Sequence, residues 1–197
     1  MNGLMMDMPL LISDLIKHAD RNHGETEIVS KTVEGNIHRY TYRDAHARAR
    51  RLARVLQGLG VKPSDRVGTL AWNGYRHYEL YYAISGIGGV INTLNPRLFP
   101  EQLTYISNHA ENSVLFFELT FVPLLEKLAP LLKTVKHFVL MTDRAHMPAS
   151  SSTTANTHNT PLFTSPMQSP QLMELLSHYL KQAIAESTSL YGVFIEV

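Results

Sequence analysis

Residues 86–103 read GIGGVINTLNPRLFPEQL, and this stretch decides the fold class of the chain. Its first residues are small and predict the end of a helix, and Val90–Leu94 then predicts a buried strand. Asn95-Pro96-Arg97 is a turn sequence, and Pro100-Glu101 predicts the start of a second helix, because proline is favoured in the first helical turn. A helix, a buried strand and another helix in direct succession are typical of an α/β protein.

The same alternation continues on both sides of this stretch. Further strands are predicted before and after it, and a helix separates each strand from the next. Strands that alternate with helices of this length predict right-handed crossovers and a parallel, doubly wound sheet. The strands are expected at Val67–Trp72, Val90–Leu94, Val114–Phe117 and His137–Met141, and the helices at Tyr75–Ile87, Glu101–His109 and Phe121–Leu132.

The residues before this sheet predict a hairpin followed by a helix. Two β-prone runs within Thr26–Tyr42 flank Gly35-Asn36, and these two residues can supply the positive φ angles of a tight turn. Thr41 followed by Asp44 is typical of a capping box, which predicts that a helix begins there. The buried face of that helix is expected to consist of the apolar residues spaced by three and four, namely Ala45, Ala49, Leu52 and Leu56.

The N-terminal residues predict one more helix, which begins near Pro9. This segment lacks the basic region of a signal peptide and reaches Asp14 too early for one. No apolar run is long enough to span a bilayer, so a cytosolic location is expected. The apolar residues expected to face the core are Leu10, Leu11, Leu15 and Ile16.

The composition fits one globular domain, with or without a tail. The chain has 197 residues, of which 44% are hydrophobic, and its formal net charge is +1. A charge balance this even argues against nucleic acid as the main partner, because binding to a phosphate backbone requires a basic excess on one face. The chain has no cysteine, which excludes disulfides, thiolate metal sites and a cysteine nucleophile.

The character of the sequence changes after about residue 144. Residues 145–173 contain no Asp, Glu, Lys or Arg, are rich in Ser and Thr, and include four prolines. Such a segment buries too little apolar surface to offset the entropy of ordering it, so residues 145–170 are interpreted as a disordered linker. Residues 171–197 predict a short amphipathic helix and a final strand.

Several weaker motifs have simpler structural explanations. Gly86–Ile91 begins like a dinucleotide fingerprint, but Ile91 stands where the third glycine belongs and the motif ends a helix instead of opening one. Ser85 stands between Ile84 and Gly86, and this does not match the Gly-x-Ser-x-Gly spacing of a nucleophile elbow. Trp72-Asn73 follows a strand at a position where α/β sheets often bind ligands, yet packing and helix capping explain these residues. The arginines expected to lie on a solvated helix face are Arg43, Arg48, Arg50, Arg51 and Arg54, and the histidines show no metal-ligand spacing.

Residues 9–143 resemble the N-terminal part of the acyl-CoA synthetases, in the acyl-adenylate-forming ligase superfamily. Four segments carry this resemblance in order: HRYTYRDAHARARRLARVLQGLGVKPSDRVGTLAWN, YRHYELYYAISGIGG, VINTLNPRLFPEQLTYISNHAENSVLFFE and LTFVPLLEKLAPLLKTVKHFVLMTD. The wording NPRLFPEQ looks most like synthetases for medium- or long-chain fatty acids. Residues 171–197 have no counterpart in this resemblance.

The resemblance implies a two-step reaction in the intact family member. MgATP adenylates a fatty acid, pyrophosphate leaves, and the thiol of coenzyme A then displaces AMP. The family performs the first step with a Ser/Thr/Gly-rich phosphate loop that ends in Pro-Lys-Gly, and with an acidic Mg site. Fixed positive charge and backbone donors are needed there because the transferring phosphoryl group carries concentrated negative charge.

No residue of this chain is expected to perform that chemistry. Pro-Lys-Gly does not occur in the sequence, and the one glycine after Gly89 is Gly192. We therefore predict no catalytic, cofactor-binding or metal-binding residue, and within the matching part we expect the glycines at 60, 68, 88 and 89 to have scaffold roles. ATP, Mg and coenzyme A are expected cofactors of the parent family and not of this chain alone.

Four hypotheses about the protein remain open. The first is a truncated fatty acyl-CoA synthetase that is inactive alone, and the second is a non-catalytic module that associates with itself or with a full-length synthetase. An unpaired sheet edge and uncovered apolar faces would favour such association. The third hypothesis is an independent flavodoxin-like module, and the fourth is an incomplete record of an active enzyme.

Overall fold

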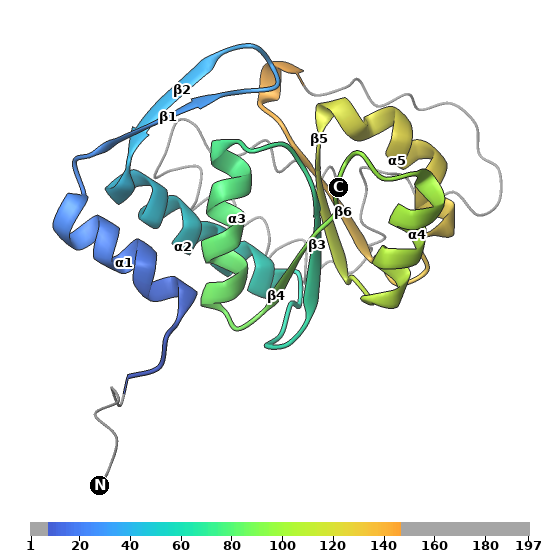
Figure 1. Cartoon of the computed structure of the whole chain (residues 1–197), viewed down its shortest axis with the longest axis horizontal. Helices are drawn as coiled ribbons and strands as arrows, with labels where there is room; N and C mark the ends of the chain where they lie inside the picture. Colours follow the sequence, from blue (N-terminus) through green and yellow to red (C-terminus); the bar gives the residue numbers. More distant parts are fainter. Residues whose placement is uncertain (1–7, 147–197) are drawn as a thin grey trace, which may run out of the picture.

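A computed structural model describes residues 8–146 of the chain (Figure 1). The linker predicted at 145–170 lies almost wholly outside the described residues, and the helix and strand predicted at 171–197 lie entirely outside them. The described part contains the predicted hairpin and the predicted alternation of strands and helices. The helices are α1 (Ile12–His23), α2 (Tyr42–Gly58), α3 (Tyr75–Gly86), α4 (Pro100–His109) and α5 (Val122–Leu128), and the strands are β1 (Glu27–Lys31), β2 (Ile37–Thr41), β3 (Arg66–Leu70), β4 (Val90–Thr93), β5 (Val114–Glu118) and β6 (His137–Met141).

The larger sheet is parallel and doubly wound, as the alternation predicts. Its strand order is β4-β3-β5-β6, and every neighbouring pair runs parallel. Helices α2 and α3 cover one face of this sheet and α4 and α5 cover the other, as Figure 1 shows. The chain moves outward from β3 to β4 and then returns to the other side of β3 to form β5, so the winding reverses between β3 and β5.

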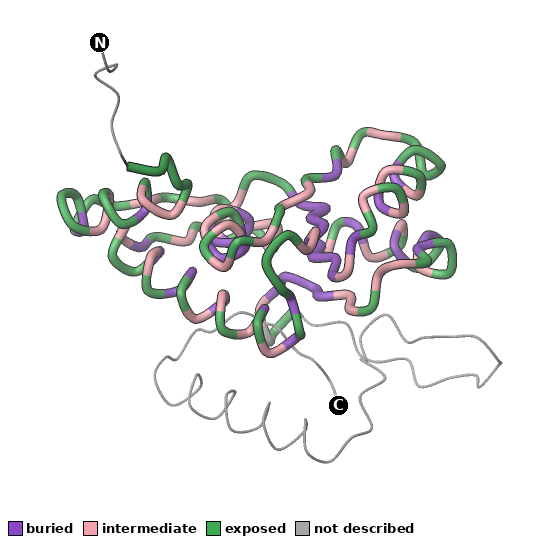
Figure 2. The backbone as a smooth tube through the Cα atoms, turned by 90° about the horizontal axis from the view of Figure 1, so that it is seen from below, coloured by how far each residue is buried: buried purple, intermediate pink, exposed green. Residues whose placement is uncertain are grey.

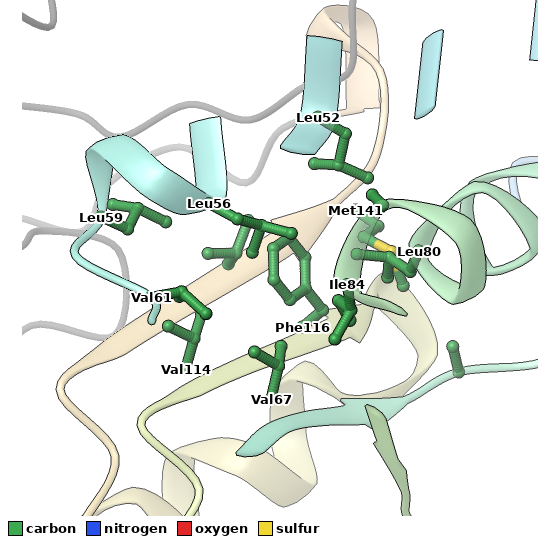
Figure 3. Close-up of a cluster of buried hydrophobic side chains, with 13 residues drawn as sticks. Leu52, Leu56, Leu59, Val61, Val67, Leu80, Ile84, Val114, Phe116 and Met141 are labelled. Atoms are coloured by element: carbon green, nitrogen blue, oxygen red, sulfur yellow. The ribbon is translucent and has the colours of Figure 1, made fainter. Parts of the chain in front are cut away.

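Each face of the sheet has its own apolar core. Because side chains alternate along a strand, Val114 and Phe116 of β5 pack against α2 and α3, whereas Leu115 and Phe117 pack against α4 and α5. Figure 3 shows the first of these cores, and Figure 2 shows that buried positions concentrate on the sheet and the inner helix faces. Burying one such side chain contributes roughly 1.5–3 kcal/mol to stability.

The strand predicted to be buried within the opening stretch is an edge strand. Among the described strands, β4 pairs with β3 alone, and Val90 is 49% exposed. The sequence pattern identifies the strand correctly but does not reveal its place in the sheet, because strand order depends on where β5 inserts. Strand β4 therefore has β3 beside it on one side, and no described strand lies along its other edge.

Helix α2 forms as its sequence predicts. The Thr41 hydroxyl accepts a hydrogen bond from the Asp44 backbone, and the Asp44 carboxylate accepts one from the Thr41 backbone N–H. This capping box satisfies two backbone donors at the start of the helix. All four predicted core residues of α2 are buried, namely Ala45, Ala49, Leu52 and Leu56.

The hairpin is present and forms a sheet of its own. Strands β1 and β2 pair antiparallel with Glu27 opposite Thr41 and Lys31 opposite Ile37. Gly35 has a positive φ of 102°, whereas Asn36 does not have one, so a single residue supplies the left-handed conformation. In Figure 1 the hairpin arches from the α1 and α2 side toward the segment that follows β6.

Helix α1 exposes most of the residues predicted to face the core. It begins at Ile12 instead of near Pro9, and of the four predicted residues only Ile16 is buried. Asp20 of this helix lies 2.7 Å from the ring of His46 on α2 and also pairs with Arg43. The residues that contradict the prediction are exposed: Leu10, Leu11 and Leu15.

Candidate functional site

The candidate site lies at the carboxyl ends of β3 and β5. Ligands of open α/β sheets bind at the point where the winding reverses, because the loops that leave the two strands there diverge. In this chain those loops are 71–74, which leads into α3, and 119–121, which leads into α5. The side chains of this edge therefore decide what the site can accept.

A buried carboxylate occupies this edge. Glu118 ends β5, and its Oε2 accepts a hydrogen bond of 2.9 Å from the backbone N–H of Trp72. A Cβ on Gly74 would lie 3.6 Å from Glu118 Oε1, which is an ordinary van der Waals contact. Burial raises the pKa of Glu118, although the Trp72 N–H and the Arg76 guanidinium both favour its charged form.

Trp72 lies in the 71–74 loop, at the carboxyl end of β3. Its side chain is 42% exposed, and its ring lies 5.4 Å from the ring of Phe121 in the opposite loop. This ring contact agrees with the packing explanation for Trp72. The capping explanation for Asn73 is wrong, because Gly74 is the N-cap of α3 and no side chain caps that helix.

Arg76 in the first turn of α3 forms a second buried group with the tip of the hairpin. Its Nη1 donates to both carboxylate oxygens of Glu34, at 2.9 and 3.2 Å, and the side chains are 6% and 1% exposed. The Thr142 hydroxyl also donates to Glu34, at 3.0 Å. Burial favours a higher pKa for Glu34, yet a backbone hydrogen bond and the Arg76 charge together lower it.

A third buried group joins α2 and α3. The Arg48 Nε–H donates to Glu79 Oε1 at 2.9 Å, and the Glu79 side chain is fully buried. Burial raises the pKa of Glu79 to about 7, against the attraction of Arg48, and burial together with Glu79 raises the pKa of the Tyr40 hydroxyl. The predicted solvated face is therefore wrong for Arg48, because its partner comes from another helix and the α2 sequence does not reveal it.

His77 is held in its neutral form beside the same edge. Its Nδ1 lies 3.2 Å from the Trp72 carbonyl oxygen, which can only accept, so Nδ1 carries the proton. Its Nε2 then accepts from the Thr69 hydroxyl at 3.0 Å. Burial lowers the pKa of His77, because a charged ring would lose most of its hydration there.

The positions of the remaining sequence motifs agree with the structural roles predicted for them. Ser85 is within α3, and Gly86–Ile91 runs from the end of α3 into β4, so it opens no helix. Gly60 and Gly88 have φ values of 82° and 77°, which fits the predicted scaffold role. Among residues 8–146, no group of three or more His, Asp or Glu side chains gathers to hold a metal ion.

Most of these buried charges could not be predicted from the sequence. Glu34 lies in a hairpin turn, where a carboxylate is normally solvated, and Glu79 and Arg76 lie on a helix whose apolar residues attracted attention instead. Glu118 had a usable signal, since a carboxylate directly after a buried parallel strand falls at the ligand-binding edge. The three carboxylates are held by partners from other elements, so the arrangement fixes loops and helices relative to one another.

In the part of the chain that the structure describes, no helix is both long and apolar enough to cross a membrane.

Comparisons with known proteins identify relatives over most of the described part. The model of the AMP-binding enzyme family matches residues 15–178. The chain is 56% identical over 144 residues to a 3-methylmercaptopropionyl-CoA ligase of Ruegeria lacuscaerulensis, which covers 73% of this chain and 27% of the relative. It is 48% identical over 141 residues to a medium-chain-fatty-acid–CoA ligase of Ectopseudomonas oleovorans, covering 72% and 26%.

A solved structure shows the same fold. The fatty acyl CoA synthetase of Mycobacterium tuberculosis superposes with a TM-score of 0.56 and 23% sequence identity, over 66% of this chain and 26% of that one. The chain thus spans about a quarter of the length of the curated relatives it matches.

Proposed function

This chain belongs to the family of AMP-binding enzymes, and on that basis we propose that residues 9–143 form the N-terminal part of an ATP-dependent ligase that joins a carboxylic acid to coenzyme A. The observation that supports this proposal most is the uninterrupted match of more than 140 residues to relatives that are named as CoA ligases. The parallel sheet with its α2–α5 helices agrees with that match.

The proposed reaction of the intact enzyme has two steps. A carboxylate oxygen of the acid attacks the α-phosphorus of ATP, which releases pyrophosphate and leaves an acyl adenylate. The thiol of coenzyme A then attacks the acyl carbon, which releases AMP and forms the thioester. We propose a medium- or long-chain fatty acid as the substrate and the cytosol, where ATP and coenzyme A are both available, as the location.

The described residues are proposed to form the scaffold of this enzyme and to perform none of its chemistry. Mg is expected to accompany ATP, but residues 8–146 offer no cluster of acidic side chains that fits it. The sequence also lacks Pro-Lys-Gly. The 197 residues alone are therefore proposed to be inactive, with α2, α3 and the hairpin held in a fixed arrangement by the buried ion pairs.

An activity assay tests this part of the proposal. The purified 197-residue chain is incubated with ATP, Mg, coenzyme A and either octanoate, palmitate or 3-methylmercaptopropionate, and acyl-CoA formation is followed by mass spectrometry. The full-length Ectopseudomonas oleovorans ligase is the positive control. No acyl-CoA is expected from the chain alone, and formation of product would contradict the scaffold role.

A chimera tests the family role directly. Residues 9–143 replace the matching segment of the Ectopseudomonas oleovorans ligase, with which they share 48% identity. A chimera that folds and keeps ligase activity supports the proposal, and a change in its preferred chain length would indicate that this segment contributes to substrate choice. A folded chimera without activity counts against the proposal.

The alternative is a non-catalytic module that associates with a full-length synthetase or with itself. The edge of β4 favours this alternative, because β4 has one described neighbour and Val90 is half exposed. Size-exclusion chromatography with light scattering, with and without a full-length ligase, distinguishes the two proposals. A monomer that elutes apart from the ligase at micromolar concentration argues against association.

A further inference from the structure

The β1–β2 hairpin depends on contacts with the helices and with the end of β6. It is a two-stranded sheet by itself, and Val29 and Ile37 on its strands are exposed. An isolated two-stranded hairpin is marginally stable in water, so its strands alone do not hold it in position. At its base, Tyr40 is buried against Ile16 and Ala45, which attaches the hairpin to α1 and α2.

The tip of the hairpin is attached through Glu34, in addition to the His38 ring of β2, which stacks on Tyr75 of α3 with 3.8 Å between the ring centroids. Glu34 precedes the exposed residues Gly35 and Asn36, yet its carboxylate is buried and is bonded to Arg76 and Thr142. These partners lie 42 and 108 residues away in the sequence. Glu34 therefore connects the hairpin at once to the start of α3 and to the end of β6.

The tip covers the carboxyl edge of the sheet. Arg76 follows β3 and Thr142 follows β6, and β5 lies between these two strands. Glu118 at the end of β5 is buried, and the charges of both Arg76 and Glu34 act on it. The tip of the hairpin thus closes over the place where the winding of the sheet reverses.

We propose that the β1–β2 hairpin is a strap over this edge and that Glu34 is its latch. When the carboxylate leaves Arg76 and Thr142 and the His38 ring separates from Tyr75, the strap swings away as a unit about its base, which exposes Glu118 and increases the exposure of the loop at Trp72. The sheet and its two cores stay intact, because the strap contributes no strand to them. This inference concerns the described fold and holds whether or not the proposed ligase reaction is correct.

Hydrogen exchange measured by mass spectrometry on the 197-residue chain tests the latch. Glu34→Gln keeps the shape of the side chain and removes its charge, and Glu27→Gln is the matched control, since Glu27 forms an exposed ion pair with Arg39 in the same hairpin. Amides of residues 27–41 are expected to exchange at least about tenfold faster in Glu34→Gln, because a hydrogen bond to a charged group is lost. Amides of α2 and β5 are expected to keep their rates in both variants.

Trp72 reports separately on the edge beneath the strap. It is the one tryptophan of the chain, so acrylamide quenching of its fluorescence measures access to this edge alone. Quenching is expected to increase in Glu34→Gln and to stay unchanged in Glu27→Gln. Faster exchange of the hairpin with unchanged quenching would overturn the statement that the strap covers the edge.

Two further results would overturn the latch. One is unchanged exchange of residues 27–41 in Glu34→Gln, and the other is an acceleration spread evenly over the hairpin, α2 and β5, which indicates global unfolding. If Glu34→Gln does not fold, exchange of the wild-type chain in low denaturant takes its place. The hairpin is then expected to open by a local route well before β5, and simultaneous opening of the two would contradict the proposal.

Discussion

The two faces of the parallel sheet are each closed by a pair of helices, yet they bury different chemistry. The buried residues of α2 and α3 include Arg48, Glu79, Arg76 and His77. On the α4 and α5 side the core is apolar, and the buried polar residues of that side, Ser107 and Asn112, are neutral and bonded to each other. Among the described residues, the buried charged side chains thus gather at α2, α3, the hairpin and the carboxyl end of β5.

This difference indicates that the two faces are held by different physical forces. An apolar core depends on filled volume and tolerates substitutions that keep it filled. A buried ion pair has a high desolvation cost and adds little net stability, but it permits only one relative orientation of its elements. We infer that α4 and α5 are held mainly by packing, whereas α2 and α3 are held by their own apolar core and are oriented, together with the hairpin, by buried ion pairs.

The largest expected effect comes from breaking one buried ion pair. Glu79→Leu leaves Arg48 without its carboxylate and is expected to lower the free energy of unfolding by about 3–5 kcal/mol. The double variant Arg48→Met with Glu79→Leu is expected to recover most of that loss, because no charge then stays buried. Urea unfolding at fixed protein concentration measures both, and a double variant as unstable as the single one would show that the pair itself stabilises this face.

Two matched substitutions that each create a cavity compare the packing of the two faces. Leu56 on α2 and Leu125 on α5 are both almost fully buried, and each Leu→Ala change is expected to cost about 2–5 kcal/mol. Leu125→Ala is expected at the lower end, because α5 has only seven residues and can move into the cavity. Urea unfolding of the two variants tests this order, which is wrong if Leu125→Ala costs more.

Gly68 tests how tightly the apolar face is filled. A Cβ there would lie 2.8 Å from Asn112 Nδ2 and 2.8 Å from Leu115 Cδ1, so Gly68→Ala is expected to cost about 1–3 kcal/mol. Gly58 at the end of α2 has no neighbour that a Cβ would meet. Gly58→Ala is therefore the control, with a gain of about 0.5–1 kcal/mol expected in thermal unfolding. Equal effects at the two glycines would argue against tight packing at Gly68.

The smallest expected effect is a pH dependence of the charged face. Burial lowers the pKa of His77 below the ordinary value of 6.5. As the pH falls below 6.5, His77 of the unfolded chain therefore binds a proton more readily than His77 of the folded chain. The stability that neutral His77 contributes is thus complete above pH 6.5 and is lost as the pH falls. The wild-type chain is expected to exceed His77→Gln in stability at pH 7.5, and this difference is expected to shrink at pH 5.5.

Comparing the wild-type chain with His77→Gln isolates this contribution from other titrating groups. Burial raises the pKa of Glu79 and Glu118, which stabilises the folded chain on acidification, but both carboxylates are present in the two proteins. Urea unfolding at the two pH values gives the difference directly. A difference that stays constant between pH 5.5 and 7.5 would exclude the neutral, buried ring as its source.

Most of the fold could be predicted from local patterns. Strand β6 has the predicted bounds, and the capping box at Thr41 and Asp44 starts α2 where its sequence indicates. Such features are local, because the residues that produce them are neighbours in the chain. The period of apolar residues in α2 likewise identifies its buried face, since the face repeats within the helix itself.

The rest depends on residues that are distant in the sequence. The apolar pattern of β4 is the same whether the strand lies at the centre or the edge, and only the insertion of β5 beside β3 decides between them. Leu10 and Leu11 lie before the first residue of α1 and are exposed, and Leu15 is exposed on the helix itself, which the apolar pattern does not distinguish from the buried Ile16. Arg48 and Glu79 are buried because each supplies the other's partner, and a pattern that counts polar residues as exposed misses both.

The bond between Thr142 and Glu34 has a consequence for the order in which the protein is made. The two residues are 108 positions apart, so at ordinary rates of translation on the order of 5 to 20 s pass between their synthesis. During this time the hairpin has already emerged from the ribosome, while the last strand of the sheet does not yet exist. In the nascent chain, β1 and β2 are therefore available to pair early, whereas the hydrogen bond between Thr142 and Glu34 forms last, once β6 lies beside β5.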